Sequence, residues 1–103
     1  MDINETAFKI ILHGGNARSQ VMEALKVARG QQIEQAQSML QKADKELTKA
    51  HQIQSDILKN EASGEKVESS LLFIHAQDHL MTAMLARDLA EEIIDLRNTN
   101  MNK

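Results

Sequence analysis

One segment decides the fold of this chain: residues 71–85, LLFIHAQDHLMTAML. At helical spacing it is apolar on nearly every side, because its side chains fall into three rows around the helix axis. The rows are Leu71, Ile74, Asp78, Met81 and Leu85; Leu72, His75, His79, Thr82, Ala86, Leu89, Ile93 and Leu96; and Phe73, Leu80 and Met84. A three-helix protomer needs one apolar row from each helix, so the surplus rows predict that further copies of the chain cover this helix.

The composition indicates an all-α chain. It has no proline, four glycines and 2% aromatic residues, whereas Ala, Gln, Glu, Lys, Leu and Met favour helix. Because 103 residues show no break in composition, residues 1–103 are expected to form a single domain with one modest core.

Two further apolar rows, stepping by three and four residues, predict the other two helices. The first helix is expected over about residues 4–29, with Gly30 as its C′ residue and with a kink, or the close approach of another backbone, at Gly14 and Gly15. The second is expected over about residues 32–60, where Gln54 interrupts the apolar row. The first row is Ile3, Ala7, Ile10, Gly14, Ala17, Val21, Ala24 and Ala28, and the second is Ile33, Ala36, Leu40, Ala43, Leu47, Ala50 and Ile57.

The third helix completes the predicted architecture. After a turn at residues 62–66 it is expected to begin between Lys66 and Ser70 and to end near Asn98, leaving residues 98–103 as a frayed tail. Short connections between three long helices predict an antiparallel up-down-up bundle. The surplus apolar rows predict that this bundle assembles as a homo-oligomer.

Charge and residue usage exclude several classes of function. The net charge is −3 and the 12 basic residues are scattered, so nucleic-acid binding is not expected. The chain has no cysteine, which excludes disulfides, thiolate metal sites and cysteine nucleophiles. No apolar run reaches the roughly 18 residues that a membrane span needs, and no signal-peptide pattern is present. We therefore expect a cytoplasmic protein with no membrane insertion.

The chemistry of the chain is concentrated in His75, Asp78 and His79, which are expected in a buried or half-buried setting where each is paired, liganded or functional. Asp78 lies in an otherwise apolar row, so it is partly solvated, protonated, hydrogen-bonded to a neighbour or compensated by a cation. If copies of this row met at a symmetry axis, a shared Mg²⁺ would neutralise the converging carboxylates.

The two histidines, at i and i+4, leave three interpretations open. They could be structural polar residues, or they could bind Zn²⁺, although Ala76 stands where the metalloprotease motif has its glutamate. In the third interpretation one imidazole accepts a phosphoryl group and the other donates a hydrogen bond to the phosphoryl oxygens.

Residues 70–87, SLLFIHAQDHLMTAMLAR, closely resemble the signature of a known family. This family is the enzyme IIA component of the lactose/cellobiose branch, which includes N,N′-diacetylchitobiose, of the bacterial phosphoenolpyruvate-dependent sugar phosphotransferase system. The segments GNARS (15–19) and EALKVA (23–28) are similar as well, and the resemblance extends over about residues 5 to 97. It implies a three-helix protomer and a homotrimer.

The resemblance also implies roles for single residues. His75 corresponds to the phosphorylated histidine, which takes the phosphoryl group from the phosphocarrier HPr and passes it to a cysteine of the cognate enzyme IIB. Gln77 and His79 correspond to residues that hold the phosphoryl group in a cleft between subunits. Asp78 corresponds to an axial carboxylate that binds a divalent metal, with Mg²⁺ expected.

Two classes of function therefore follow from the sequence. The first is a phosphotransferase component that serves uptake of a disaccharide, namely cellobiose or another β-glucoside, lactose or chitobiose. The second is a structural or metal-binding helical oligomer without phosphotransfer. Phosphorylation of His75 distinguishes the two.

Overall fold

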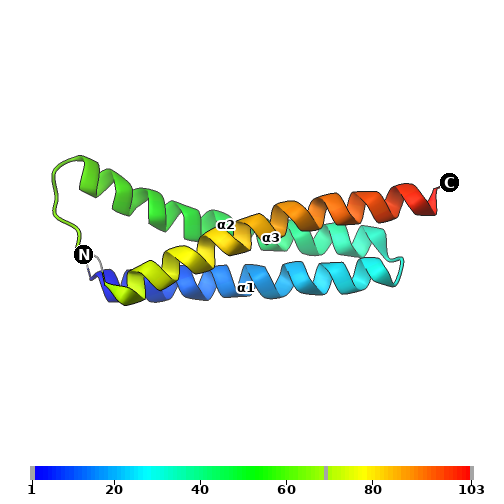
Figure 1. Ribbon diagram of the computed structural model, residues 1–103, viewed down its shortest axis with the longest axis horizontal. Coiled ribbons are helices and arrows are strands. Elements are labelled where there is room, and N and C mark those ends of the chain that lie inside the picture. Colours follow the sequence, from blue (N-terminus) through cyan, green and yellow to red (C-terminus); the bar gives the residue numbers. More distant parts are fainter. Residues whose placement is uncertain (1, 69, 103) are drawn as a thin grey trace.

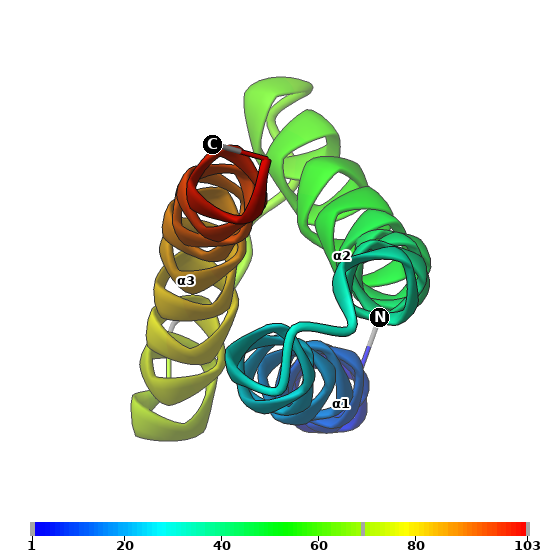
Figure 2. The same cartoon turned by 90° about the vertical axis from the view of Figure 1, so that its right-hand side faces the viewer.

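The computed structural model describes residues 2–68 and 70–102 and consists of three long helices. They are α1 (Ile3–Arg29), α2 (Ile33–Ala62) and α3 (Leu71–Met101). The helices run up, down and up in a bundle 56 × 20 × 17 Å in extent, and the C-terminal part of α3 projects past the α1–α2 turn (Figure 1). Seen end-on, the three helices form a triangle (Figure 2). The predicted all-α, up-down-up fold is confirmed.

The helix ends agree with prediction to within a few residues. Asp2 caps α1, its Oδ1 accepting from the backbone N–H groups of Asn4 and Glu5. The stop after Arg29 is confirmed, but Gly30 has a φ of −79° and the left-handed residue is Gln31, with a φ of 69°. The positive φ that a C′ glycine usually takes is thus displaced by one residue.

Both ends of α3 lie slightly beyond their predicted positions. The connection before α3 extends through Ser70, whose side chain accepts from the Phe73 N–H at 3.1 Å and caps the helix. Residues 98–101 are helical and not frayed, because backbone bonds continue to the Asn102 N–H, which donates to the carbonyl of Asn98. Residues 69 and 103, part of the predicted connection and tail, lie outside the described residues.

The core follows the predicted rows of α1 and α2, with Ile3 half-buried at the edge. The row that α3 contributes is different from the expected ones. Its buried residues are Ala76, Leu80, Ala83, Ala90 and Ile94. Of the three predicted rows, only the one containing Leu80 contributes to this face, since small alanines allow closer helix packing than the bulky residues of the other rows. No polar or charged side chain of the described residues is buried.

Gly14 marks the close contact between α1 and α3. Helix α1 continues through it, and a Cβ at this position would lie 3.7 Å from the backbone of His79 and Leu80. The expectation of a close backbone approach is therefore confirmed. The contact places the middle of α1 directly behind His79.

Polar side chains fasten α2 to both of its neighbours. His13 of α1 and Glu46 of α2 are 2.6 Å apart between Nδ1 and Oε2. Arg87 of α3 donates to both carboxylate oxygens of Asp44, at 2.5 and 3.0 Å, and also pairs with Glu91. Hydrogen bonding to Asp44 raises the pKa of the Arg87 guanidinium above its usual value, against the opposing effect of burial. Among the residues described, no helix has the length and apolar character that a bilayer crossing requires.

Candidate functional site

The two histidines of α3 form a close pair on the surface of the protomer. Nε2 of His75 and Nε2 of His79 are 3.0 Å apart, and the two rings meet edge to face with their centroids 4.5 Å apart. His75 is exposed and His79 is half-buried. For this contact to be a hydrogen bond, one Nε2 carries the proton and the other accepts it.

Local structure holds this pair in place. Helix α3 begins at Leu71, so His75 and His79 stand on its second and third turns, on the same side. The backbone of His79 packs against Gly14 of α1, which fixes that turn against the bundle. An open apolar hollow of about 430 Å³, lined by Leu71, Leu72 and His75, adjoins the pair. An approaching molecule can reach His75 from this side.

Gln77 lies on a different side of α3. Two residues from His75, its side chain is rotated by about 200° at the helical 100° per residue. Its Oε1 accepts a hydrogen bond of 2.7 Å from Nε2 of Gln54 on α2. The structure therefore brings His75 and His79 together but separates Gln77 from both within one protomer.

Asp78 occupies the exposed apolar face of α3. Its neighbours on that face are well exposed, from Ile74 at 52% to Leu71 at 83%. This agrees with the row predicted from the sequence. Within the protomer, Asp78 and His75 are both exposed, so the expected buried or half-buried setting requires the predicted further copies of the chain.

One protomer does not supply a complete metal site. The described residues contain no cluster of three or more histidine, aspartate or glutamate side chains that could hold an ion. Mg²⁺ prefers near-octahedral oxygen ligands, and Asp78 alone offers one carboxylate. The residues fit a metal only if Asp78 carboxylates from several copies of the chain converge.

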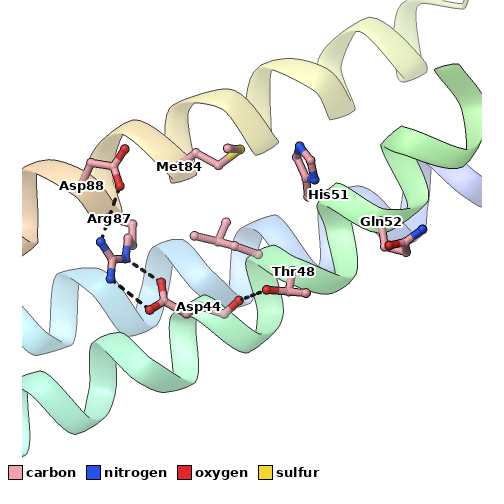
Figure 3. A pocket seen from close by; sticks show the side chains of 8 residues that line it. Asp44, Thr48, His51, Gln52, Met84, Arg87 and Asp88 are labelled. Carbon is pink, nitrogen blue, oxygen red and sulfur yellow. Dashed lines mark hydrogen bonds and ion pairs between the residues drawn. The ribbon is translucent and has the colours of Figure 1, made fainter.

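A shallow groove separates α2 from α3 on the side toward which Gln77 points. It has a volume of about 430 Å³, and Figure 3 shows Met84 and His51 on opposite walls, with the Asp44–Arg87 pair at one end. Arg87 is engaged by Asp44, Asp88 and Glu91, so its charge is already balanced. The guanidinium of Arg87 is therefore not a free cationic group in this groove, whose lining combines the apolar Leu47 and Met84 with polar side chains.

Sequence reasoning missed the partner of Gln77. The signal was present, since Gln54 is the single polar residue at a row position of α2, but a helical pattern does not reveal which residue of another helix it bonds. The Asp44–Arg87 and His13–Glu46 pairs were missed for the same reason, as they join residues 43 and 33 positions apart.

Comparison with known proteins identifies the family of this chain. Residues 5–98 match the family described as "PTS system, Lactose/Cellobiose specific IIA subunit". The chain belongs to this family. It is therefore a component of a sugar phosphotransferase system, as its sequence motif predicted.

Relatives agree in sequence and in structure over nearly the whole chain. The lichenan-specific phosphotransferase enzyme IIA component of Bacillus subtilis is 52% identical over 92% of this chain and 86% of the relative. The crystal structure of the cellobiose-specific enzyme IIA from Bacillus anthracis superposes with a TM-score of 0.95 at 42% identity, covering 100% of this chain and 94% of that one.

A third relative was solved with a partner. The IIA(chitobiose) protein of Escherichia coli, in complex with HPr, superposes with a TM-score of 0.84 at 35% identity and covers 98% of both chains. This IIA chain thus shares its full fold with a protein known in complex with a phosphocarrier.

Proposed function

We propose that this IIA chain is a cytoplasmic phosphocarrier that accepts a phosphoryl group from HPr on His75 and passes it to a cysteine of the cognate enzyme IIB. The observation that carries the proposal is the exposed His75–His79 pair, with its two Nε2 atoms 3.0 Å apart. The HPr complex of the IIA(chitobiose) relative supports HPr as donor.

The proposed chemistry is substitution at phosphorus. The lone pair of His75 Nε2 forms the new P–N bond while the bond from phosphorus to the donor breaks, its electron pair leaving with the donor. A hydrogen bond donated by His79 Nε2–H selects the His75 tautomer whose Nε2 carries no proton. His79 then releases the lone pair of His75 Nε2 before it attacks phosphorus, and turns its N–H to a phosphoryl oxygen. In the second step the thiolate of enzyme IIB forms an S–P bond as the P–N bond breaks, which restores neutral His75.

The site is proposed to be completed in a homotrimer. The exposed row of Leu71, Ile74, Met81 and Leu85 lacks a partner within the protomer, and packing it around a three-fold axis would remove it from water. In such an assembly the His75 side of one α3 faces the Gln77 side of the next. Gln77 would then bind the phosphoryl group on a neighbouring subunit's His75.

Asp78 is proposed to hold a divalent cation at the same axis. Three carboxylates brought together repel one another, and Mg²⁺ with its water ligands would neutralise them. The ion would stabilise the assembly and would take no part in phosphoryl transfer, because His75 lies on the flank of α3 and not on the axial row.

The sugar is proposed to be a β-glucoside disaccharide of the cellobiose type, with lactose and chitobiose as the other candidates. The lichenan-specific and cellobiose-specific relatives support this order. Comparing uptake of the three sugars in cells with and without this chain tests it. Loss of lactose or chitobiose uptake alone would overturn the order.

One measurement separates this function from a structural or metal-binding oligomer. Incubation of the chain with phosphoenolpyruvate, enzyme I and HPr should add one phosphoryl group to His75, detected by intact mass and peptide mapping under neutral conditions. Omission of HPr is the control. A chain that stays unmodified in the complete mixture would be the structural oligomer of the second class.

A further inference from the structure

Gln54 breaks a pattern that the rest of α2 keeps. The buried row steps by three and four residues and would continue through position 54 to Ile57, yet this position carries an amide. Leucine or alanine would extend the row, as at Leu47 and Ala50. A polar side chain at a packing position of a helix interface is retained only if it is hydrogen-bonded, and the partner of Gln54 is Gln77, at 2.7 Å.

Two polar links join α2 to α3 in the described part of the chain, and they have different chemistry. One is the bidentate pair between Asp44 and Arg87. The other is the Gln54–Gln77 pair, ten residues along each helix in the antiparallel direction. Besides these links, Ile57 of α2 and Leu80 of α3 belong to the same buried core. Gln54 is thus one of several contacts between α2 and α3, and the variants below test whether it has a further role.

The hydrogen bond from Gln54 fixes the orientation of the Gln77 side-chain amide. A glutamine amide has an acceptor face and a donor face, and phosphoryl oxygens only accept hydrogen bonds. Because Gln54 Nε2 donates to Gln77 Oε1, the Gln77 carbonyl points to α2 and its NH₂ group points away from α2. The donor face is the one that can bind a phosphoryl group.

We propose that Gln54 is a positioning residue for phosphoryl transfer: its N–H holds the carbonyl of Gln77, so that the Gln77 NH₂ is presented to the phosphoryl group on a neighbouring subunit's His75. This inference rests on the proposed function, and it adds a residue of α2 to a site otherwise built from α3. Preorganising a donor removes the cost of turning it during the reaction.

Three substitutions separate orientation from packing. Gln54→Leu removes the bond and completes the apolar row, so Gln77 becomes free to rotate while the bundle keeps its stability. In Gln54→Glu the carboxylate only accepts hydrogen bonds. It therefore binds the Gln77 NH₂ group, and the Gln77 carbonyl turns toward the phosphoryl group. Gln77→Leu removes the amide. Gln35→Glu, the same chemical change on the exposed face of α2, is the matched control.

The rate of phosphoryl transfer from phospho-HPr is measured for the full chain under single-turnover conditions at saturating donor, with melting temperature and assembly recorded for each variant. We expect Gln54→Glu to be slowed on the order of 10-fold, about as much as Gln77→Leu, and Gln54→Leu by about 3-fold, as a hydrogen bond to a charged group predicts. The apparent KM for HPr should stay unchanged. Gln35→Glu should transfer at the wild-type rate.

A variant with substitutions at both Gln54 and Gln77 distinguishes a role of Gln54 in orienting Gln77 from a merely structural role. In a Gln77→Leu background, Gln54→Glu should cause no further slowing, since the two residues act as one unit. Side-chain ¹⁵N–¹H resonances assigned to Gln77 should shift in both Gln54 variants, independently of activity.

Three outcomes would overturn the inference: wild-type rates in both Gln54 variants, equal slowing by Gln54→Glu with and without Gln77, or a loss of rate that follows melting temperature alone. Each leaves the proposed function intact as long as the wild-type chain is phosphorylated on His75. A wild-type chain that never accepts the phosphoryl group would overturn the function itself.

Discussion

The inner and outer faces of α3 differ in the size and the exposure of their side chains. The inner face is made of Ala76, Leu80, Ala83, Ala90 and Ile94, all buried and mostly small. The outer face carries larger apolar side chains, and Leu71 and Leu85 are 83% and 60% exposed. Alanines let α3 pack closely on α1, as the Gly14 contact with the backbone of His79 illustrates. Bulk on the other side has no role in the protomer and therefore points to an assembly.

The faces differ in chemistry as well. The inner face contains no buried polar side chain, whereas Asp78 lies on the outer face and His75 on its flank. The residues that fold the protomer and the residues proposed to serve its function are thus separated around one helix. Substitutions on the two sides are expected to change different measurements.

The largest effect is expected on the functional flank. His75→Ala should abolish phosphoryl acceptance, because it removes the nucleophile, and should leave helicity and assembly unchanged, because alanine is a strong helix former at an exposed position. Intact mass after incubation with phospho-HPr measures the first, and circular dichroism and light scattering the second. His51→Ala, which removes an exposed histidine of α2, is the control. Undiminished labelling of His75→Ala would contradict the assignment.

A matched pair of leucine substitutions tests the two faces directly. Leu80→Ala should destabilise the protomer by about 2–5 kcal/mol, because it leaves a cavity in the core. Leu85→Ala should instead weaken the oligomer and change unfolding of the dissociated protomer little. Denaturant unfolding at several protein concentrations separates the two effects. Equal loss of concentration-independent stability in both variants would contradict the contrast between the faces.

Asp78→Leu tests the outer face as an interface. If Asp78 meets its own copies as proposed, leucine at this position should tighten the assembly by roughly 1–4 kcal/mol and make it insensitive to EDTA, whereas chelation should loosen the proposed wild-type trimer. Sedimentation or native mass spectrometry with and without Mg²⁺ measures this. His75 should still be phosphorylated. Loss of phosphorylation in an intact trimer would instead make Asp78 a group that orients His75.

The smallest of the four effects is expected from His79→Ala. This variant loses the hydrogen-bond donor proposed to bind the phosphoryl group, worth roughly 1–3 kcal/mol, and should transfer about 10-fold more slowly while remaining phosphorylated on His75. Phosphorylation assays quenched at successive times measure the rate of transfer. Complete loss in both His75→Ala and His79→Ala would leave the nucleophile unassigned between the two.

Some features were predictable because they depend on local periodicity. The three helices, the buried rows of α1 and α2, the pairing of His75 with His79 and the membership of Asp78 in an apolar row all follow from spacing at 3.6 residues per turn. The motif of residues 70–87 further identified the family. These properties lie within one helix or one contiguous segment, so the sequence contains all the information that they need.

Other features were decided only by the tertiary structure. The close approach of α1 and α3 decided which row of α3 faces the core. The row with small alanines faces it, and the predicted rows of bulky side chains do not. The sequence placed Gln77 in a cleft between subunits but did not show that its carbonyl accepts a hydrogen bond from Gln54, 23 residues earlier in the chain. Contacts between helices depend on their relative rotation and register, and no periodicity within a single helix specifies either.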